Sequence, residues 1–290
     1  MLKLVAINKP LGVSSFKALG QVKKFYNTKK IGHLGTLDPL AEGVLAVAVG
    51  DGTKLIPYID TEPKEYIVEI FFGVSTDTFD AEGLDKELVF KKGIQKGIEL
   101  DKISLKLDEI GACEEQVPPI FSAVKINGKR AYDLARKGQI EQSEIKPKKV
   151  QLYSYEVLNF ELPILKLKLS TSSGYYVRSL VRDLGIKLDV DCFMYSLLRT
   201  KVGGFNIDNC SYFELEDVIE IAPEKVLNKF ERINLTEDKY LNLRNGLSVE
   251  FEVTGLLNEV VFAYYKDELC AICKVHRNEG LIKSIRNLNL

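Results

Sequence analysis

Two segments alternate apolar and polar side chains at a period of two, and this pattern restricts them to one kind of structure. EYIVEIFFG (65–73) and ILKLKLS (164–170) place every second side chain on the same side, as a strand with one buried face does. RSLVRDLGIKL (178–188) has helical periodicity instead. A further amphipathic helix with a basic polar face is predicted over 15–27, preceded by serine N-cap candidates. Because strands and helices mix without strict strand–helix–strand alternation, the pattern favours an α+β fold.

The stretch GHLGTLDPLAEGVL (32–45) surrounds one aspartate, Asp38, with glycines and a proline. Residues 28–43 have no sustained period and are predicted to form a loop, whereas VLAVAV (44–49) suits a buried strand. Asp38 is therefore predicted on a loop that enters a strand. Pro39 restrains the neighbouring backbone, so the carboxylate can be presented to a ligand. The alternative is that Asp38 only closes an Asx turn.

The pattern changes after about residue 230, where short strand-like runs are separated by turn residues. These runs are LSVEFEV, EVVFAYY and LCAICKV, and they predict a small all-β module over 231–290 after a larger unit over 1–230. Cys270 and Cys273 form a CxxC in the last run, but neither a second CxxC nor a nearby histidine pair accompanies them. Buried strand cysteines are favoured, and no metal site is predicted.

The net charge of −1 conceals two basic segments. Residues 1–58 contain eight lysines and three acids, and residues 121–149 contain eight Lys or Arg and three acids, so each segment carries +5. Residues 80–117, with ten acids and six lysines, carry −4. The basic segments suit a polyanion such as nucleic acid, and solvated helix faces are the alternative. Within 121–139, an Asn-Gly pair predicts a hairpin turn before a basic, helix-like stretch.

Several other classes of protein are disfavoured. The apolar run at the N-terminus is short for a signal peptide, and no segment approaches the ~20 apolar residues of a membrane span, so we expect a cytoplasmic protein. GDGTK (50–54) lacks the GK[ST] order of a phosphate loop. TDTFDAEG (76–83) imitates half a calcium loop, but Leu88 stands where the closing glutamate belongs.

Six segments, in their order along the chain, together resemble the bacterial tRNA pseudouridine-55 synthases of the TruB family. They are KPLGVSS, KKIGHLGTLDPLAEGVLAVAVGDGTK, KEYIVEIFFGVSTDTFDAEG, PPIFSAVKINGKRAYDLARKG, SGYYVRSLVRDLG and LLRTKVGGF. The resemblance implies a pseudouridine-synthase fold with a mixed, largely antiparallel sheet and a small PUA-like C-terminal domain. It implies an isomerase that converts a uridine of the tRNA T-loop to pseudouridine. No cofactor and no protein partner would be required, and the expected state is a monomer bound to the tRNA T-stem-loop.

The same resemblance assigns roles to individual residues. Asp38 corresponds to the catalytic aspartate, and a nucleophilic carboxylate can split one difficult step into two easier ones through a covalent intermediate. Arg178 corresponds to the arginine that pairs with this aspartate, and Asp80 is a second carboxylate that could share it. Tyr66 is expected to stack on the uracil and to assist removal of the C5 proton. Tyr176 and Leu197 are expected to line the uridine pocket.

Reaction at the glycosidic bond requires the uridine to leave the base stack, which costs a few kcal/mol that stacking partners must offset. The resemblance implies that His33 inserts where the flipped nucleotides leave the T-loop. It also gives phosphate-binding or structural roles to a further set of basic residues, which are Lys9, Lys54, Lys125 and Arg199.

Four questions stay open at the level of sequence. Asp38 could attack C6 of the base or C1′ of the ribose, and the uridine selected is not specified. A relative that modifies another RNA with guide RNA is the alternative enzyme, although such synthases need accessory proteins and a longer basic tail. A catalytically silent tRNA chaperone is the alternative outside catalysis, and the intact Asp38 argues against it.

Overall fold

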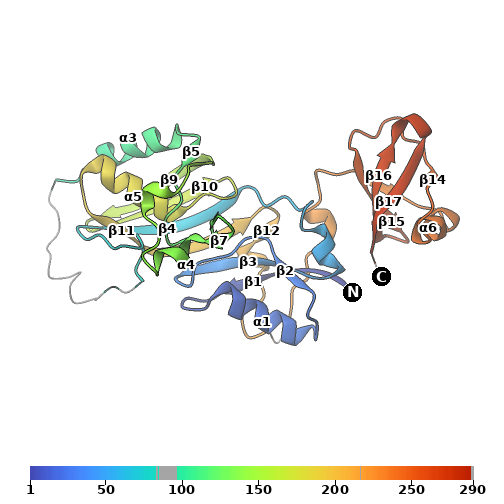
Figure 1. The fold of residues 1–290 in the computed structure, drawn as a ribbon, viewed down its shortest axis with the longest axis horizontal. Coiled ribbons are helices and arrows are strands. Elements are labelled where there is room, and N and C mark those ends of the chain that lie inside the picture. The colour runs from blue at the N-terminus through green and yellow to red at the C-terminus, as the bar shows by residue number, and fades with distance from the viewer. Residues whose placement is uncertain (83, 85–96, 216, 289–290) are drawn as a thin grey trace.

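The computed structural model describes residues 1–82, 84, 97–215 and 217–288. Leu88 and part of the acidic segment 80–117 lie outside these described residues. A large mixed sheet with helices on its faces occupies most of the molecule, and a smaller sheet lies at one end (Figure 1). This arrangement confirms the α+β fold.

The large sheet has eight strands in the order β1-β3-β11-β4-β10-β9, with β2 added to β3 and β12 added to β11. All of its pairings are antiparallel except the parallel pair β3–β11, so the sheet is mixed and largely antiparallel, as expected. Its strands are β1 (Leu2–Lys9), β2 (Ile31–His33), β3 (Ala41–Gly50), β4 (Lys64–Phe72), β9 (Leu152–Glu161), β10 (Ile164–Thr171), β11 (Cys192–Val202) and β12 (Phe205–Asn206).

Three helices cover this sheet. They are α1 (Ser15–Phe25), α3 (Leu100–Gly111) and α5 (Val177–Leu188). The apolar faces of α3 and α5 pack on β4 and β10 in one core, and α1 packs on β1 and β3 in another. The predicted helix 15–27 ends at Phe25, and Asn27 takes a left-handed φ of 45° shortly afterwards. The segment predicted as a loop, 28–43, contains β2 and the first residues of β3.

Strand β3 is buried on both faces, which explains why it reads as an almost continuous apolar run. Leu45, Val47 and Val49 face the core under α1. Ala46 and Ala48 face a different core, which β1 and β3 share with residues of the smaller sheet. Side chains of successive strand residues point to opposite faces, so one strand supports two cores.

The smaller sheet has five strands in the order β13-β15-β16-β17-β14. They are β13 (Arg232–Asn234), β14 (Val249–Glu250), β15 (Val260–Tyr265), β16 (Glu268–His276) and β17 (Leu281–Asn287). The helix α6 (Glu237–Arg244) accompanies the sheet and was not foreseen, because its residues have no helical apolar stripe. Cys270 and Cys273 are buried free thiols on β16, as the sequence favoured.

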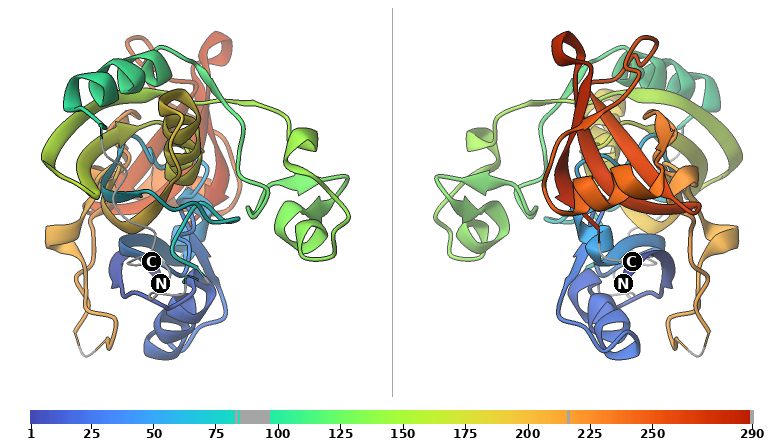
Figure 2. Two further views of the ribbon diagram at one scale, coloured as in Figure 1. Left: turned by 90° about the vertical axis from the view of Figure 1, so that its left-hand side faces the viewer. Right: turned by 90° about the vertical axis from the view of Figure 1, so that its right-hand side faces the viewer.

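The basic segment 121–149 forms a separate projection. It contains the hairpin β6 (Lys125–Ile126) and β7 (Lys129–Arg130), followed by α4 (Ala131–Ala135). Both turn residues, Asn127 and Gly128, have positive φ, as a tight hairpin turn requires. Figure 2 shows this green segment projecting from the body of the molecule. A separate antiparallel pair of strands, β5 (Glu115–Gln116) and β8 (Lys148–Lys149), brings the two ends of this segment together.

Short 3₁₀ turns complete the described chain. They are η1 (Asp51–Leu55), η2 (Gln142–Glu144), η3 (Ile207–Asn209), η4 (Pro223–Lys225) and η5 (Arg277–Glu279).

Candidate active site

The loop that carries Asp38 connects β2 to β3, where β3 approaches β11 unusually closely. Arg199 of β11 and Gly43 of β3 are register partners in the parallel pair. Gly43 has a φ of +99°, and a Cβ there would lie 2.2 Å from the carbonyl oxygen of Arg199, so only glycine fits. This close approach places the end of the loop against β11.

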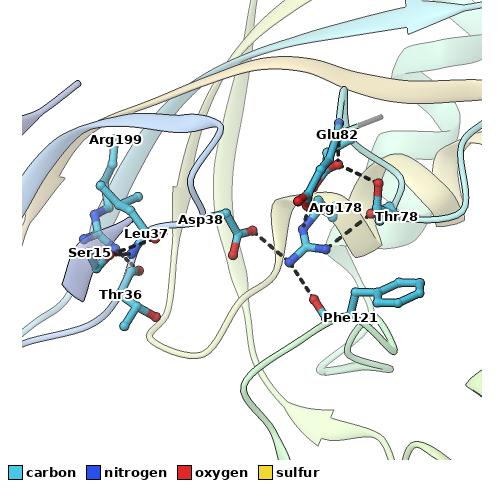
Figure 3. Close-up of polar contacts among 10 residues, drawn as sticks. Ser15, Thr36, Leu37, Asp38, Thr78, Glu82, Phe121, Arg178 and Arg199 are labelled. Atoms are coloured by element: carbon cyan, nitrogen blue, oxygen red, sulfur yellow. Dashed lines mark hydrogen bonds and ion pairs between the residues drawn. The ribbon is translucent and has the colours of Figure 1, made fainter. Parts of the chain in front are cut away.

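The side chain of Arg199 holds the same loop from inside the protein. Arg199 is buried, and its guanidinium donates three hydrogen bonds to backbone carbonyl oxygens. The acceptors are Gly35 (3.1 Å), Thr36 (3.1 Å) and Val44 (2.9 Å). The Oγ of Ser15 adds a reciprocal pair with the amide and carbonyl of Leu37, each 2.8 Å long (Figure 3). Each acceptor left unsatisfied would cost about 1–3 kcal/mol.

Lys9 ties the β1 end to the far side of the loop. Its ammonium is buried and donates to the carbonyl oxygens of Val13 (2.7 Å), Pro10 (3.0 Å) and Pro39 (3.3 Å). Burial lowers the pKa of Lys9 to about 8, and the carboxylates of Glu42 and Asp38 act in the opposite direction. The observed contacts of Arg199 and Lys9 are thus with the backbone of the Asp38 loop and its neighbouring segments.

Asp38 is held by Arg178, the second residue of α5. An Oδ of Asp38 lies 2.8 Å from a terminal nitrogen of Arg178. The Arg178 side chain is only 5% exposed, whereas that of Asp38 is 44% exposed. One carboxylate oxygen is therefore fixed by a charge-assisted hydrogen bond while the carboxylate stays accessible to a ligand (Figure 3).

The Arg178 guanidinium is itself fixed by three other groups. It donates to the carbonyl oxygens of Phe121 (3.0 Å) and Thr78 (3.3 Å), and its Nε lies 3.6 Å from Asp80. Asp80 is buried and accepts hydrogen bonds from the Thr78 hydroxyl (2.6 Å) and the Glu82 amide (2.9 Å). Asp80 thus shares Arg178 with Asp38, and its burial suits a supporting role behind the arginine.

Asp38 borders a cavity of about 230 Å³. This volume is smaller than the roughly 300–1,000 Å³ of drug-sized sites, which suits a single flat base. The lining includes Gly35, Asp38, Lys64, Tyr66, Tyr176, Arg178, Leu197 and Arg199. The structure therefore brings together the expected nucleophile, its arginine and the three residues expected around the base.

The two tyrosines of this cavity come from different elements. Tyr66 lies on β4 and is buried, and Tyr176 directly precedes α5. Burial raises the pKa of Tyr66, while the neighbouring Arg199 guanidinium acts against this rise. Burial also raises the pKa of Tyr176. Both hydroxyls are consequently protonated at neutral pH, so Tyr66 begins any proton transfer as a neutral phenol.

His33 ends β2 and is exposed, and it is not among the residues that line the cavity. Its Nδ1 accepts a hydrogen bond of 3.2 Å from the Gly35 amide. Desolvation, and to a smaller extent the charge of Arg199, lower the pKa of His33 below its usual value. The imidazole is therefore neutral at pH 7, with one nitrogen already committed to the loop.

Comparisons with known proteins agree with this geometry. The family model described as TruB family pseudouridylate synthase (N terminal domain) matches residues 23–177. The protein named tRNA pseudouridine synthase B of Clostridium tetani is 38% identical over 254 residues, which is 85% of this chain and 85% of that protein. The same-named protein of Carboxydothermus hydrogenoformans is 39% identical over 268 residues, covering 91% of each. This chain belongs to the TruB family.

Solved structures show the same fold at low sequence identity. A Cbf5-Nop10-Gar1 complex contains a chain that is 21% identical, with a TM-score of 0.65 over 94% of this chain and 78% of that one. An H/ACA RNP bound to a substrate RNA containing 2′-deoxyuridine contains one that is 19% identical, with a TM-score of 0.67 over 99% of this chain and 85% of that one. These similarities support the fold described above for this chain.

Two of the expected RNA-binding lysines of this TruB family chain have very different surroundings. The ammonium of Lys54 lies 3.0 Å from Asp51 and donates to the carbonyl oxygen of Asn287 at 2.7 Å, so it connects η1 to the last strand. Lys125 is exposed on the hairpin β6–β7. The observed contacts of Lys54 are structural, whereas Lys125 stays a candidate for binding phosphate.

A second, larger cavity adjoins the first on the other side of Asp38. It measures about 500 Å³ and extends from the Asp38 loop to the hairpin and α4. Phe16 on its rim is 79% exposed. The guanidinium groups of Arg130 and Arg136 lie 5.8 and 5.9 Å from the centre of the Tyr132 ring. Aromatic rings beside cations, here the exposed Phe16 near Lys23 and the half-buried Tyr132, are suited to stacking on bases.

Sequence reasoning missed Lys64, Tyr132 and Phe16 as site residues. A signal for Lys64 was present, because it stands two residues before Tyr66 at the start of an alternating strand and so shares its face. Phe16 and Tyr132 read as ordinary apolar positions of amphipathic segments, and only the tertiary structure shows that they border a cavity.

The described part of this TruB family chain contains no cluster of three or more His, Cys, Asp or Glu that could hold a metal ion. None of the helices in the same residues is long and apolar enough to cross a membrane.

Proposed function

We propose that this protein is a tRNA pseudouridine synthase that isomerises uridine 55 in the T-loop, with Asp38 as its nucleophile. The observation that carries the proposal is the accessible carboxylate of Asp38, held at 2.8 Å by a buried arginine on the wall of a base-sized cavity. Relatives that are 35–39% identical over most of this chain are named tRNA pseudouridine synthase B, which supports tRNA as the substrate.

The chemistry follows from the residues around the cavity. The N1–C1′ bond of a uridine must break, and the uracil must turn and rejoin the ribose through C5 without leaving the site. A carboxylate can hold one of the two fragments covalently in the meantime. Tyr66 and Tyr176 offer aromatic surfaces to the base, and Leu197 adds an apolar one. Such contacts offset the cost of unstacking a flipped nucleotide.

The division of the structure into two sheets supports further proposals about the domains. We infer that residues 1–230 catalyse the reaction and that residues 231–290 form a PUA-like module that contributes to RNA binding. The five-stranded sheet, whose first strand begins at Arg232, supports this division. We propose that His33, exposed at the end of β2, occupies the space that flipped nucleotides vacate. We further propose that the enzyme acts as a monomer in the cytoplasm, without guide RNA or protein partners.

The test is to map pseudouridine in an unmodified tRNA transcript after incubation with the purified protein alone. Carbodiimide labelling followed by primer extension should give one new stop, at uridine 55. A transcript with cytidine at that position is the matched control and should give none. Modification that depends on an added guide RNA, or a stop outside the T-loop, would contradict the proposal.

The exposed hairpin gives a separate prediction about binding. Replacing Lys125, Lys129 and Arg130 together with Gln should weaken tRNA binding, because phosphate contacts release counterions. If all three contact phosphates, the slope of log K against log salt concentration should flatten by about 2, at roughly 0.7–0.9 per contact. Filter binding between low and physiological salt measures this slope.

The control for this prediction removes the same number of charges elsewhere. Lys166, Lys168 and Lys187 already form ion pairs with glutamates, so replacing them with Gln should leave the slope nearly unchanged. An equal flattening in both triple variants would mean that the hairpin has no special contact with RNA.

A further inference from the structure

Lys64 occupies an unusual position for a lysine. It is the first residue of β4, and because strand side chains repeat every second residue, it shares a face with Tyr66. Lys64 is only 9% exposed and lines the same cavity as Asp38. Gly35, with a φ of +125°, makes room for it, since a Cβ there would lie 3.2 Å from the Lys64 Nζ.

The surroundings of Lys64 do not neutralise its charge. Within the described residues, its ammonium makes no hydrogen bond or ion pair, in contrast to Lys9 with its three carbonyl partners. Glu62, the carboxylate that favours its charged form, is occupied by the Ser173 amide at 2.9 Å and the Tyr153 hydroxyl at 2.5 Å. A nearly buried cation without a partner opposes folding, so its presence here calls for a functional reason.

The other cations of the cavity are already engaged. All three nitrogens of the Arg199 guanidinium donate to backbone carbonyls of the Asp38 loop and β3. The guanidinium of Arg178 contacts the carboxylates of Asp38 and Asp80 and donates hydrogen bonds to two carbonyl oxygens. Among the described residues that line the cavity, Lys64 is thus the cation that remains available to a ligand.

We propose that Lys64 stabilises the negative charge that develops on the uracil during the reaction. This inference rests on the proposed function. If Asp38 attacks C1′, its oxygen forms the new bond while the N1–C1′ electron pair moves onto the base, which becomes a uracil anion. If Asp38 adds to C6, the displaced electron pair becomes an enolate at O4. In both cases the carboxylate's charge passes to the base.

Lys64 keeps its proton throughout this sequence. When C5 bonds to C1′ and Asp38 leaves, the base loses its C5 proton and N1 gains one, so the reaction is a net isomerisation. A fixed cation in a site sheltered from water stabilises such transient charge more than it stabilises the neutral substrate. Lys64 would therefore accelerate the chemical step without contributing much to tRNA affinity.

Lys64→Met tests this assignment, because methionine has a similar length and no charge. In the full-length protein, the single-turnover rate of pseudouridine formation should fall about 10²–10³-fold, as for loss of one oxyanion-stabilising donor. The affinity for tRNA should stay within about twofold of wild type. Lys64→Gln is the second variant, and Lys168→Met, on the exposed side of β10, is the matched control and should keep the wild-type rate.

Thermal unfolding separates this function from a structural role. Removing a partnerless buried cation should leave the melting temperature of Lys64→Met unchanged or raise it. A structural lysine would give the opposite result, a lower melting temperature with a rate loss that follows unfolding. That outcome in both Lys64 variants would overturn the proposal.

The leaving base provides a more specific readout. Fluorine at C5 withdraws electrons and stabilises a uracil anion, so tRNA containing 5-fluorouridine should need Lys64 less. The consumption of 5-fluorouridine is measured by nuclease digestion and mass spectrometry. The ratio of the wild-type rate to the Lys64→Met rate should be at least tenfold smaller with 5-fluorouridine than with uridine. Equal deficits on both substrates would exclude a role in base charge.

The pH profile gives an independent check. Burial lowers the pKa of Lys64 to about 8, with Arg199 acting in the same direction and Glu62 against it; Asp38, Tyr66 and Tyr176 line the same cavity. The protonated form is lost as pH rises through this value. Wild-type kcat/KM, which reports the free enzyme, should therefore decline above about pH 8. The decline should be shallower in Lys64→Met, where Lys9 is the remaining lysine of the site with a pKa of about 8. A decline of the same shape in both would count against Lys64.

The two levels of inference fail in different ways. A wild-type protein that forms no pseudouridine in tRNA overturns the proposed function and, with it, the role of Lys64. A wild-type protein that forms pseudouridine while Lys64→Met keeps its full rate overturns the role of Lys64 alone.

Discussion

Asp38→Asn should abolish pseudouridine formation while tRNA binding stays near wild-type affinity. In the wild-type protein, Arg178 lies 2.8 Å from the Asp38 carboxylate. The amide of the variant keeps the shape of the side chain and one oxygen that can accept the same hydrogen bond. It lacks the negative charge and the nucleophilic oxygen that a covalent step requires. Loss of rate without loss of affinity is the mark of an interaction that acts only after the substrate binds.

The measurement is single-turnover release of tritium from tRNA that carries 5-tritiated uridine, performed beside filter binding. Asp80→Asn is the matched control, because it changes the other carboxylate on Arg178 in the same way. Asp80→Asn should keep measurable tritium release. Release by Asp38→Asn at even a tenth of the wild-type rate would show that Asp38 is not the nucleophile, and complete loss of release in Asp80→Asn instead would point to Asp80.

Arg178→Lys should have the second largest effect and reduce the single-turnover rate by about 10²-fold. The guanidinium of Arg178 contacts two carboxylates and two carbonyl oxygens from separate segments at once. An ammonium is a single point with three donors and cannot reproduce this planar fork. Some of these carboxylate and carbonyl oxygens would lose their hydrogen-bond donor, and the Asp38 carboxylate would no longer be held in its position on the cavity wall.

Stability and activity should therefore both respond to this substitution. Asp80 is buried, so a weakened partner leaves part of its charge uncompensated and should lower the melting temperature. Arg182→Lys is a suitable comparison, since Arg182 lies one helical turn further along α5 and its ion pair is with its neighbour Asp183. If Arg178→Lys matched Arg182→Lys in rate, the arrangement around Asp38 would not depend on the guanidinium.

The strands and helices near the site could be predicted from the sequence because their patterns are local. The alternating segments 65–73 and 164–170 became β4 and β10, and the helical period of 178–188 became α5. The strand order and the parallel pair β3–β11 are not local properties, since they depend on how distant segments meet. The resemblance to a known family implied only that the sheet is mixed and largely antiparallel, and it supplied the assignments of Asp38 and Arg178.

The roles of the basic residues could not be predicted in the same way. The resemblance left phosphate-binding and structural roles open for Lys9, Lys54 and Arg199, and in the structure their charged groups contact backbone carbonyls or Asp51. Whether a cation faces solvent, a carbonyl or an empty cavity is decided by tertiary packing. For the same reason Lys64 could not be singled out, although it stands in the same short motif as Tyr66.

The sharing of β3 between two cores limits how this protein can change over evolutionary time. Ala46 and Ala48 face a core completed by Phe262 and Ile272 of the smaller sheet, while the intervening residues face α1. A descendant that lost its last sixty or so residues would lose part of this core, and the apolar residues of the larger unit that had packed against the smaller sheet would be exposed to solvent. Several residues would then have to become polar together, so the shared core couples the fate of the strand that leads to the Asp38 loop to that of the C-terminal strands.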